Sequence, residues 1–197
     1  MTDSTSSRAR ARRPGKRERL VAAATGLLHE QGIERTTLAD IAAAADVPAG
    51  NVYYYFKAKD ELIAAVIEAR AEQIKSALAA IDARCSSPKD RLKALVREFA
   101  AQGESVAEYG CPFGTLCAEL GKRSGQPGPE AAGLMRLPIE WAQAQFRSLG
   151  RRDAPDLAID LLAAYEGSAL LANTMRDPGI LTGAADRIER WIDSLVT

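Results

Sequence analysis

Apolar residues recur every three or four positions along most of the chain, which is the period of an amphipathic helix. The first such stretch covers residues 16–31, and Gly32 follows it as a stop signal. A short second helix is expected after Thr37, whose side chain can form a capping box with Asp40 three residues later. No segment has a pattern that we assign to a β-strand.

A third helix is expected over residues 48–56, because the fixed φ of Pro48 suits the first position of a helix. The fourth helix is long and covers residues 59–84. Breaks rich in Gly, Pro and Ser then separate five further helices, expected at 88–109, 112–123, 130–149 with a bend at Pro138, 154–176 and 183–196. The pattern therefore predicts an all-α chain of about nine helices.

Four consecutive aromatic residues, in the sequence VYYYF, lie in the third predicted helix. Each helical residue turns by about 100°, so one buried stripe cannot hold all four rings. Val52 can share the inner side with Tyr55 and Phe56, three and four positions later. The outer side then carries Gly50, Asn51, Tyr53 and Tyr54.

This outer side has the chemistry of a DNA-binding surface. Phenol and amide groups form hydrogen bonds with phosphate oxygens and base edges, and a glycine allows close approach. Lys59 can neutralise a phosphate, and Thr37 can present a hydroxyl at a helix start. A short helix, a tight turn and a second short helix match a helix-turn-helix. Alternatively, the aromatic residues only pack two helical layers together, but the pattern favours DNA binding.

The segment DVPAGNVYYYFKAKDEL, preceded by Thr36-Thr37, closely resembles the DNA-binding signature of the TetR family of bacterial repressors. The resemblance covers about residues 16–62 and keeps the spacing Gly-x-x-Tyr-x-x-Phe-x-x-Lys. It implies that Gly50 and Tyr53 approach bases. It also implies phosphate contacts by Thr37, Asn51, Tyr54 and Lys59, with a lesser contribution from Tyr55. Pro48 and Ala49 depart from the family pattern, where a serine and a lysine supply further contacts.

Residues 1–14 lack apolar periodicity and are expected to be a disordered basic arm. The family resemblance implies a helix-turn-helix domain over 15–60, and a ligand-binding and dimerisation domain over 61–197. The last two helices are the expected homodimer surface, because small residues let two backbones approach while larger ones add contact area. The candidates are Ala164, Gly167, Ser168, Leu171, Met175, Ile188, Trp191 and Leu195. Alternatively, both helices cover only the core of their own subunit.

A ligand pocket is implied among the fourth to eighth predicted helices, for an apolar or electrophilic small-molecule inducer and without a cofactor. Its candidate residues are Phe99, Tyr109, Cys111, Phe113, Leu116, Cys117, Trp141, Phe146 and Tyr165. Apart from Cys111, each of these residues taken singly is more typical of an ordinary core position than of a ligand contact.

Cys111 differs because it precedes Pro112 in YGCPFGTLCAEL, where it can cap the following helix. A helix N-terminus lowers the pKa of a thiol and makes it more reactive. The stretch also resembles a segment of the repressor of N-ethylmaleimide reductase, a TetR-family sensor of electrophiles and oxidants. A structural thiol is the alternative.

Charge is distributed unevenly along the 197 residues, although the net charge is zero. Residues 1–60 contain ten Lys/Arg and seven Asp/Glu, and the first twenty residues contain seven of those basic groups. A basic arm on a neutral body suggests an anionic partner, although a solvated tail or an arm that binds RNA or a membrane surface would look alike.

Other protein classes find little support in the sequence. No apolar stretch approaches the ~20 residues of a membrane span, and three cysteines suit a reducing cytoplasm. One histidine, His29, offers neither a metal site nor a base for a cysteine nucleophile, so an enzyme is not expected. The prediction is a cytoplasmic homodimeric repressor that binds a palindromic double-stranded operator.

Overall fold

The structure of the chain, a computed structural model, describes residues 14–124 and 129–195. These residues form ten α-helices and no strand. The helices are α1 (Lys16–Arg35), α2 (Leu38–Ala44), α3 (Ala49–Tyr55), α4 (Lys59–Arg84), α5 (Pro88–Ala100), α6 (Gly103–Tyr109), α7 (Gly114–Ser124), α8 (Pro129–Ser148), α9 (Ala154–Met175) and α10 (Gly179–Ser194). The predicted all-α class is confirmed. Most of the basic arm expected over 1–14 lies outside the described residues.

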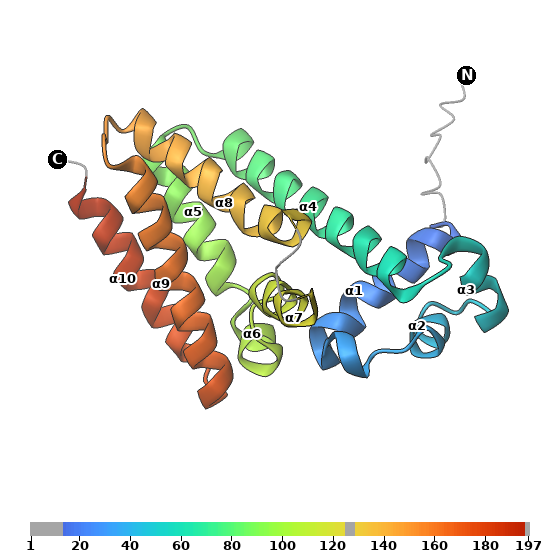
Figure 1. Cartoon of the computed structure of the whole chain (residues 1–197). Helices are drawn as coiled ribbons and strands as arrows, with labels where there is room; N and C mark the ends of the chain where they lie inside the picture. The colour runs from blue at the N-terminus through green and yellow to red at the C-terminus, as the bar shows by residue number, and fades with distance from the viewer. Residues whose placement is uncertain (1–13, 125–128, 196–197) are drawn as a thin grey trace, which may run out of the picture.

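The helices are arranged as a small head and a larger body (Figure 1). The head consists of α1, α2, α3 and the first turns of α4, and the body consists of the rest of α4 with α5–α10. Helix α4 runs from one part to the other, while α6 and α7 lie between α1 and the remaining helices of the body. A helix of 26 residues is about 39 Å long, so α4 is a rigid connection between the two parts.

Local signals in the sequence set the start of α2. The Asp40 amide donates to Thr37 Oγ1 at 3.1 Å, and the Thr37 amide donates to Asp40 Oδ2 at 2.9 Å, which is the expected capping box. Helix α3 begins at Ala49, one residue later than the predicted start at Pro48. Pro48 instead has an extended ψ of 133° and occupies the capping position before the helix.

The expected stop at Gly32 is a kink with φ of 83°, after which one more short turn completes α1 at Arg35. A positive φ favours glycine, because a Cβ would clash with the backbone. The amide that follows the kink, on Ile33, donates to Glu119 Oε2 at 2.6 Å. The carboxylate of α7 therefore satisfies a backbone group that the kink in α1 leaves open.

Two boundaries in the body differ from the expectation. The stretch 88–109 forms two helices, because the chain turns at Ala101 and Gln102 and buries Gly103 against Pro178. Helix α10 begins at Gly179 rather than at 183, since the Asp177 side chain accepts the Gly179 amide at 2.8 Å. The segment DPG thus starts the last helix instead of separating it from the preceding one.

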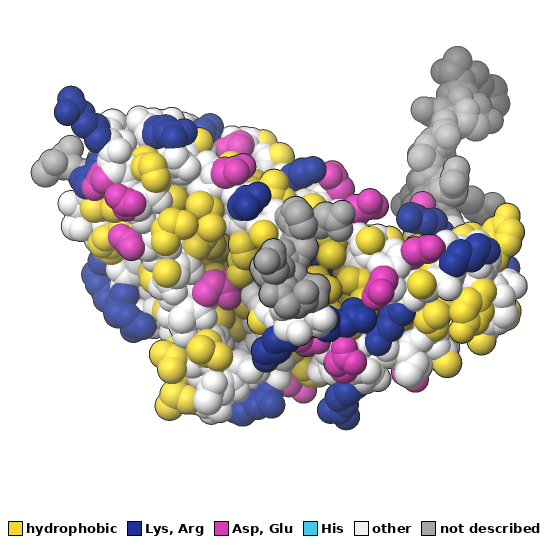
Figure 2. Space-filling model, viewed as in Figure 1, with side chains coloured by type: hydrophobic (Ala, Val, Ile, Leu, Met, Phe, Trp, Pro, Cys, Tyr) yellow, Lys and Arg dark blue, Asp and Glu magenta, His cyan; other side chains and the backbone are white. Residues whose placement is uncertain are grey.

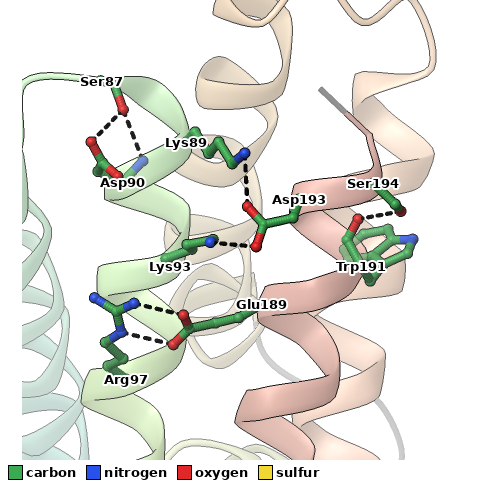
Figure 3. A network of polar contacts seen from close by, with 9 residues as sticks. All are labelled: Ser87, Lys89, Asp90, Lys93, Arg97, Glu189, Trp191, Asp193 and Ser194. Carbon is green, nitrogen blue, oxygen red and sulfur yellow. Dashed lines mark hydrogen bonds and ion pairs between the residues drawn. The ribbon is translucent and has the colours of Figure 1, made fainter. Parts of the chain in front are cut away.

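Ion pairs join α5 to α10 along their exposed edges (Figure 3). The Asp193 carboxylate accepts hydrogen bonds from the ammonium groups of Lys89 and Lys93 at 2.7 and 2.6 Å. The Glu189 carboxylate accepts hydrogen bonds from Nε and Nη2 of Arg97 at 2.7 and 2.6 Å. Exposed pairs of this kind add little stability individually, but the bidentate geometry fixes the register between two helices.

Candidate nucleic-acid interface and ligand cavity

The outer face of α3 has the composition expected from the aromatic run. Val52 and Phe56 are 1% and 2% exposed, whereas Tyr53 and Tyr54 are 58% and 78% exposed. The predicted division of these residues between core and solvent is confirmed, because a seven-residue helix packed on one side must leave its opposite side open. Figure 2 shows hydrophobic side chains, among which tyrosines are counted, gathered over α3 at the right-hand end of the view.

The remaining residues of this surface differ in accessibility. Gly50 is exposed, and a Cβ added there would meet nothing within 4 Å, so its backbone is open to close approach. Asn51 and Tyr55 are half-buried, and the Tyr55 ring lies edge-on to Tyr54 with centroids 5.0 Å apart. Lys57 is exposed and its ammonium donates to the Tyr53 carbonyl at 2.8 Å, which adds a positive charge beside the two exposed tyrosines.

Two of the predicted phosphate-binding residues already have partners in the protein. The Thr37 hydroxyl donates to Asp40 Oδ2 at 2.6 Å, and the Lys59 ammonium donates to the Ile33 carbonyl. Lys59 therefore ties the start of α4 to the end of α1. It retains donors for a phosphate, because an ammonium has three, while the Thr37 hydroxyl must give up its bond to Asp40 first.

Basic residues at the start of α1 also hold the head together. The Arg17 guanidinium lies over the Phe56 ring at 5.3 Å, and Arg19 donates to the Ala45 and Asp46 carbonyls at 2.9 and 3.1 Å. These two arginines thus hold α1 against the end of α3 and against the turn between α2 and α3. The number of basic residues in the sequence does not distinguish such structural arginines from those of a free arm.

A cavity of about 220 Å³ lies in the body. Its apolar lining comes from α4, α5, α8, α9 and the turn before α7, and consists of Ile74, Ala77, Leu78, Leu95, Phe99, Phe113, Met135, Pro138, Leu162 and Tyr165. Three of the nine candidate ligand residues are among them: Phe99, Phe113 and Tyr165. Phe99 and Tyr165 stack with centroids 4.1 Å apart and an interplanar angle of 22°.

Six candidates do not line this cavity: Tyr109, Cys111, Leu116, Cys117, Trp141 and Phe146. The Trp141 indole donates to Asp82 at 3.1 Å and joins α8 to α4, and Phe146 is fully buried against the Trp191 ring. Their prediction as ligand contacts is not supported by this geometry. An aromatic residue in a helical pattern does not reveal whether a core or a cavity faces it.

Polar residues of the cavity were missed by the sequence prediction: Arg70, Gln73, Glu98, Gln102 and Glu166. The Arg70 guanidinium lies 5.8 Å from the centre of the Phe113 ring and donates to Gln73 Oε1 at 3.3 Å and to the Thr25 carbonyl of α1 at 3.4 Å. Partial burial lowers the pKa of Arg70. A charged residue four positions before Ile74, on the apolar side of α4, is the sequence signal that points to this site.

Comparison with known proteins agrees with this architecture. Residues 20–66 match the family model described as bacterial regulatory proteins, tetR family. The chain is 35% identical to the HTH-type transcriptional regulator TtgR of Pseudomonas putida, over 90% of this chain and 88% of that protein. It is 30% identical to the HTH-type transcriptional repressor DhaR of Mycobacterium sp. (strain GP1), over 78% and 80% of the two chains.

The chain belongs to the TetR family of transcriptional regulators. The crystal structure of a TetR regulator from Legionella pneumophila superposes with a TM-score of 0.81 at 23% identity, and covers 93% of this chain and 98% of that one. The reduced form of E. coli NemR superposes with a TM-score of 0.76 at 21% identity, over 89% and 96% of the two chains. These structures show the shared TetR fold, which has a helix-turn-helix head, and they do not bear on the chemistry of Cys111.

The Cys111 thiol of this TetR-family chain has surroundings that suppress ionisation. Burial and the negative charge of Glu166 raise the pKa of Cys111 to about 12, although the Gly114 amide approaches the sulfur at 3.4 Å. The expectation of a lowered pKa is therefore wrong, because desolvation and a neighbouring carboxylate outweigh the N–H groups of the turn. Cys111 lies behind the cavity wall and donates to Glu166 Oε1 at 3.1 Å.

The outer face of α9, where the sequence analysis predicted a dimer surface, exposes apolar side chains. Leu171 and Met175 are 53% and 66% exposed, and Ala164 and Gly167 are also exposed. Three more of the expected residues are half-buried: Ser168, Trp191 and Leu195. Ile188 is 7% exposed and packs into its own core, so it offers only an edge to a partner. Leu170 and Ile159 are exposed as well and were missed.

Other classes of site find no support in the described part of the chain. No helix there is both long enough and apolar enough to cross a membrane. Within the same residues, no group of three or more His, Cys, Asp or Glu side chains is placed to hold a metal ion. TetR-family membership makes the chain a transcriptional regulator rather than an enzyme.

Proposed function

We propose that this TetR-family regulator is a homodimeric repressor that binds a palindromic operator through α3 and releases it when a small molecule fills the cavity of the body. One observation carries the proposal: Tyr53 and Tyr54 are largely exposed on a helix whose other side is sealed by Val52 and Phe56. Large exposed aromatic residues on one face mark an interaction surface. The relative DhaR is a transcriptional repressor, which supports repression rather than activation.

The outer face of α3 suits the major groove of DNA. Gly50 and Tyr53 approach base edges, since one offers bare backbone and the other a phenol that both donates and accepts. Phosphates are bound by Asn51, Tyr54 and Lys59, with Lys57 as an additional cation and with Thr37 and Tyr55 contributing at the edges. The proposed domain division, 15–60 for DNA and 61–197 for ligand and dimerisation, follows the head and the body.

Two copies pair through α9 and α10 in this proposal. Between these helices the surface has a hollow of about 400 Å³, lined by Asp160, Ala164, Ser168, Ala184, Arg187, Ile188 and Trp191. Small residues at Ala164 and Ser168 allow a partner helix to approach closely. A twofold dimer places two α3 helices one DNA turn apart, as a palindrome requires.

Contacts between body and head provide the route for induction. The Gly110 carbonyl accepts from His29 Nε2 at 2.9 Å, Glu119 binds the Ile33 amide, and Arg70 reaches from the cavity to the Thr25 carbonyl. A ligand that moves α4 or the turn before α7 therefore moves α1. The ligand shifts the equilibrium only as far as it binds the non-DNA-binding state more tightly.

The test is operator selection from random duplexes, followed by affinity measurements on Tyr53→Ala, on Tyr53→Phe and on a chain lacking residues 1–15. We expect Tyr53→Ala to lose the preference for the selected palindrome, Tyr53→Phe to lose it partly, and the truncated chain to keep it with lower affinity. A protein that binds only through its basic arm would show the reverse: tolerance of Tyr53→Ala and loss of binding on truncation. That result would refute the proposal.

A further inference from the structure

Glu166 is a half-buried carboxylate on the cavity wall without a cation of its own. Among the described residues, its hydrogen-bond donor is the Cys111 thiol, which is a weak one, and no ion pair reaches it. Burial raises the pKa of Glu166. The other cavity carboxylate, Glu98, is in a different situation, because it pairs with Arg84 at 2.5 Å.

The aromatic residues near Glu166 also favour a positively charged ligand. Tyr165 and Phe99 are stacked on the cavity wall, and Phe113 and Met135 also line it. The faces of aromatic rings carry negative potential and bind organic cations, while methionine adapts its shape to apolar ligands.

Arg70 is the only basic side chain among the lining residues of this cavity in the described structure, and it is engaged elsewhere. Its guanidinium donates to Gln73 and to the Thr25 carbonyl and lies over Phe113. No ion pair within 4.0 Å joins it to Glu166. The charge of Arg70 is therefore used to hold α1 and the Phe113 ring, whereas the charge of Glu166 is left for a ligand.

We propose that the cavity selects a lipophilic organic cation, whose positively charged nitrogen lies against Glu166 and whose apolar part packs on Phe99, Tyr165 and Met135. This inference rests on the proposed function of the cavity as the inducer site. The apolar lining bounds the size of the ligand, since about 220 Å³ holds one or two aromatic rings. Partial burial of a carboxylate without a cation costs free energy, so a cationic ligand removes a penalty that the free protein carries.

Three probes of one shape test the charge preference: N-methyl-4-phenylpyridinium, which is a cation, 4-phenylpyridine, which is neutral at pH 8, and 4-phenylbenzoate, which is an anion. Binding is measured by calorimetry on the full chain and on Glu166→Gln and Glu98→Gln. We expect the cation to bind roughly tenfold more tightly than the neutral probe. In Glu166→Gln the affinities for the cation and for the neutral probe should differ by no more than about twofold. Glu98→Gln removes the carboxylate that already has a partner and should keep the preference for the cation.

The possible outcomes separate this inference from the function on which it rests. Equal binding of cation and neutral probe, or tightest binding of 4-phenylbenzoate, overturns the charge assignment and leaves the cavity as a ligand site. Failure of all three probes to bind overturns both the charge assignment and the inducer cavity, while operator selection tests DNA binding independently. Thermal melting of each variant shows whether a lost preference reflects a lost fold.

Discussion

At the scale of single residues, burial decides which chemical groups of this protein are active. The two exposed tyrosines of α3 and the half-buried Glu166 have incomplete sets of partners, whereas the Cys111 thiol is enclosed and hydrogen-bonded. The sequence predicted a lowered pKa for the Cys111 thiol, with a structural thiol as the alternative, and gave no sign of Glu166. The error arose because a cysteine near a helix start can be recognised in a sequence, but the carboxylate from α9 that opposes its ionisation cannot.

The pH dependence of ligand binding follows from the raised pKa of Glu166. Protonation removes the negative charge, so affinity for N-methyl-4-phenylpyridinium should be constant above this pKa and fall as the pH drops through it. The loss should begin at a higher pH than for an exposed glutamate. Arg70 faces the cavity from α4 and Glu98 from α5, and Glu98 is already paired with Arg84, while the Cys111 thiol contacts Glu166 from behind the cavity wall. A titration of affinity against pH that matches that of Glu166→Gln would contradict the prediction.

Thiol reactivity gives a second check at this scale. Because its pKa is raised to about 12, Cys111 should be almost entirely protonated at pH 7 and should react with iodoacetamide far more slowly than an unperturbed thiol. Mass spectrometry of the labelled peptides over time measures this rate, with a peptide thiol as the reference. In Glu166→Gln the rate at Cys111 should rise, since a neighbouring negative charge is removed. Rapid alkylation of Cys111 in the native chain at neutral pH would restore the electrophile-sensor hypothesis.

At the scale of helices, the contacts that join head to body lie where α1 meets the turn before α7 and α7 itself. His29 contacts both the Gly110 carbonyl and the Tyr109 ring, and Arg123 of α7 pairs with Glu34 and Asp60 at 3.1 and 3.2 Å. Helix α4, which runs from the head to the body, is one connection between the two parts. Contacts of α7 with α1 and with the start of α4 form a second connection. Its residues are far apart in the sequence, since Arg123 is 63 positions from Asp60 and 89 positions from Glu34.

Substitution of Gly32, at the kink in α1, tests that second connection. Its φ of 83° disfavours any L side chain, and a Cβ there would lie 2.9 Å from Glu119 Oε1. Gly32→Ala should lower the free energy of unfolding by about 1–2 kcal/mol through the backbone alone, and more if Glu119 is displaced from the Ile33 amide. Denaturant unfolding measures the change.

Gly26→Ala is the matched control in the same helix, because a Cβ there meets only the end of the Glu30 side chain at 3.9 Å. It should be neutral or should stabilise the chain by about 0.5–1 kcal/mol, through lower entropy of the unfolded state. If both alanine variants were equally stable, the strain assigned to Gly32 would be wrong.

At the scale of the whole molecule, the apolar surface of α9 and the exposed face of α3 lie on different parts, the body and the head (Figure 1). This separation suits a protein that pairs through one part and binds DNA through the other. In such a dimer the spacing of the two heads depends on how each body is packed, so a ligand inside the body can change operator affinity without touching α3.

The proposed dimer surface is tested by introducing a charge at Leu171. Leu171→Glu should shift the chain from dimer to monomer in sedimentation experiments and lower the affinity for the palindrome by two orders of magnitude or more, because paired half-sites would be bound one at a time. Ala80→Glu, which places the same charge at an exposed position of α4, should leave both properties unchanged. A Leu171→Glu chain that remained dimeric would place the interface elsewhere.

The sequence by itself determined the helical class, the bounds of α4, the capping box of α2 and the side of α3 that faces solvent. These features depend on local spacing: apolar periodicity, a cap three residues from its partner, and the rotation of about 100° per helical residue. A short helix with one sealed side has a single way to orient its aromatic residues, so Tyr53 and Tyr54 were identified correctly as exposed.

Only the tertiary structure decided which aromatic residues line the cavity, where the stretch 88–109 divides, and how Cys111 and Lys59 are used. Each of these depends on a neighbour far away in the chain: Glu166 for Cys111, Pro178 for Gly103 and the Ile33 carbonyl for Lys59. Periodicity reports that one side of a helix is buried, but a cavity, a core and a polar contact satisfy the same period. They differ in which residues pack against the buried side of the helix, and those residues come from distant parts of the sequence.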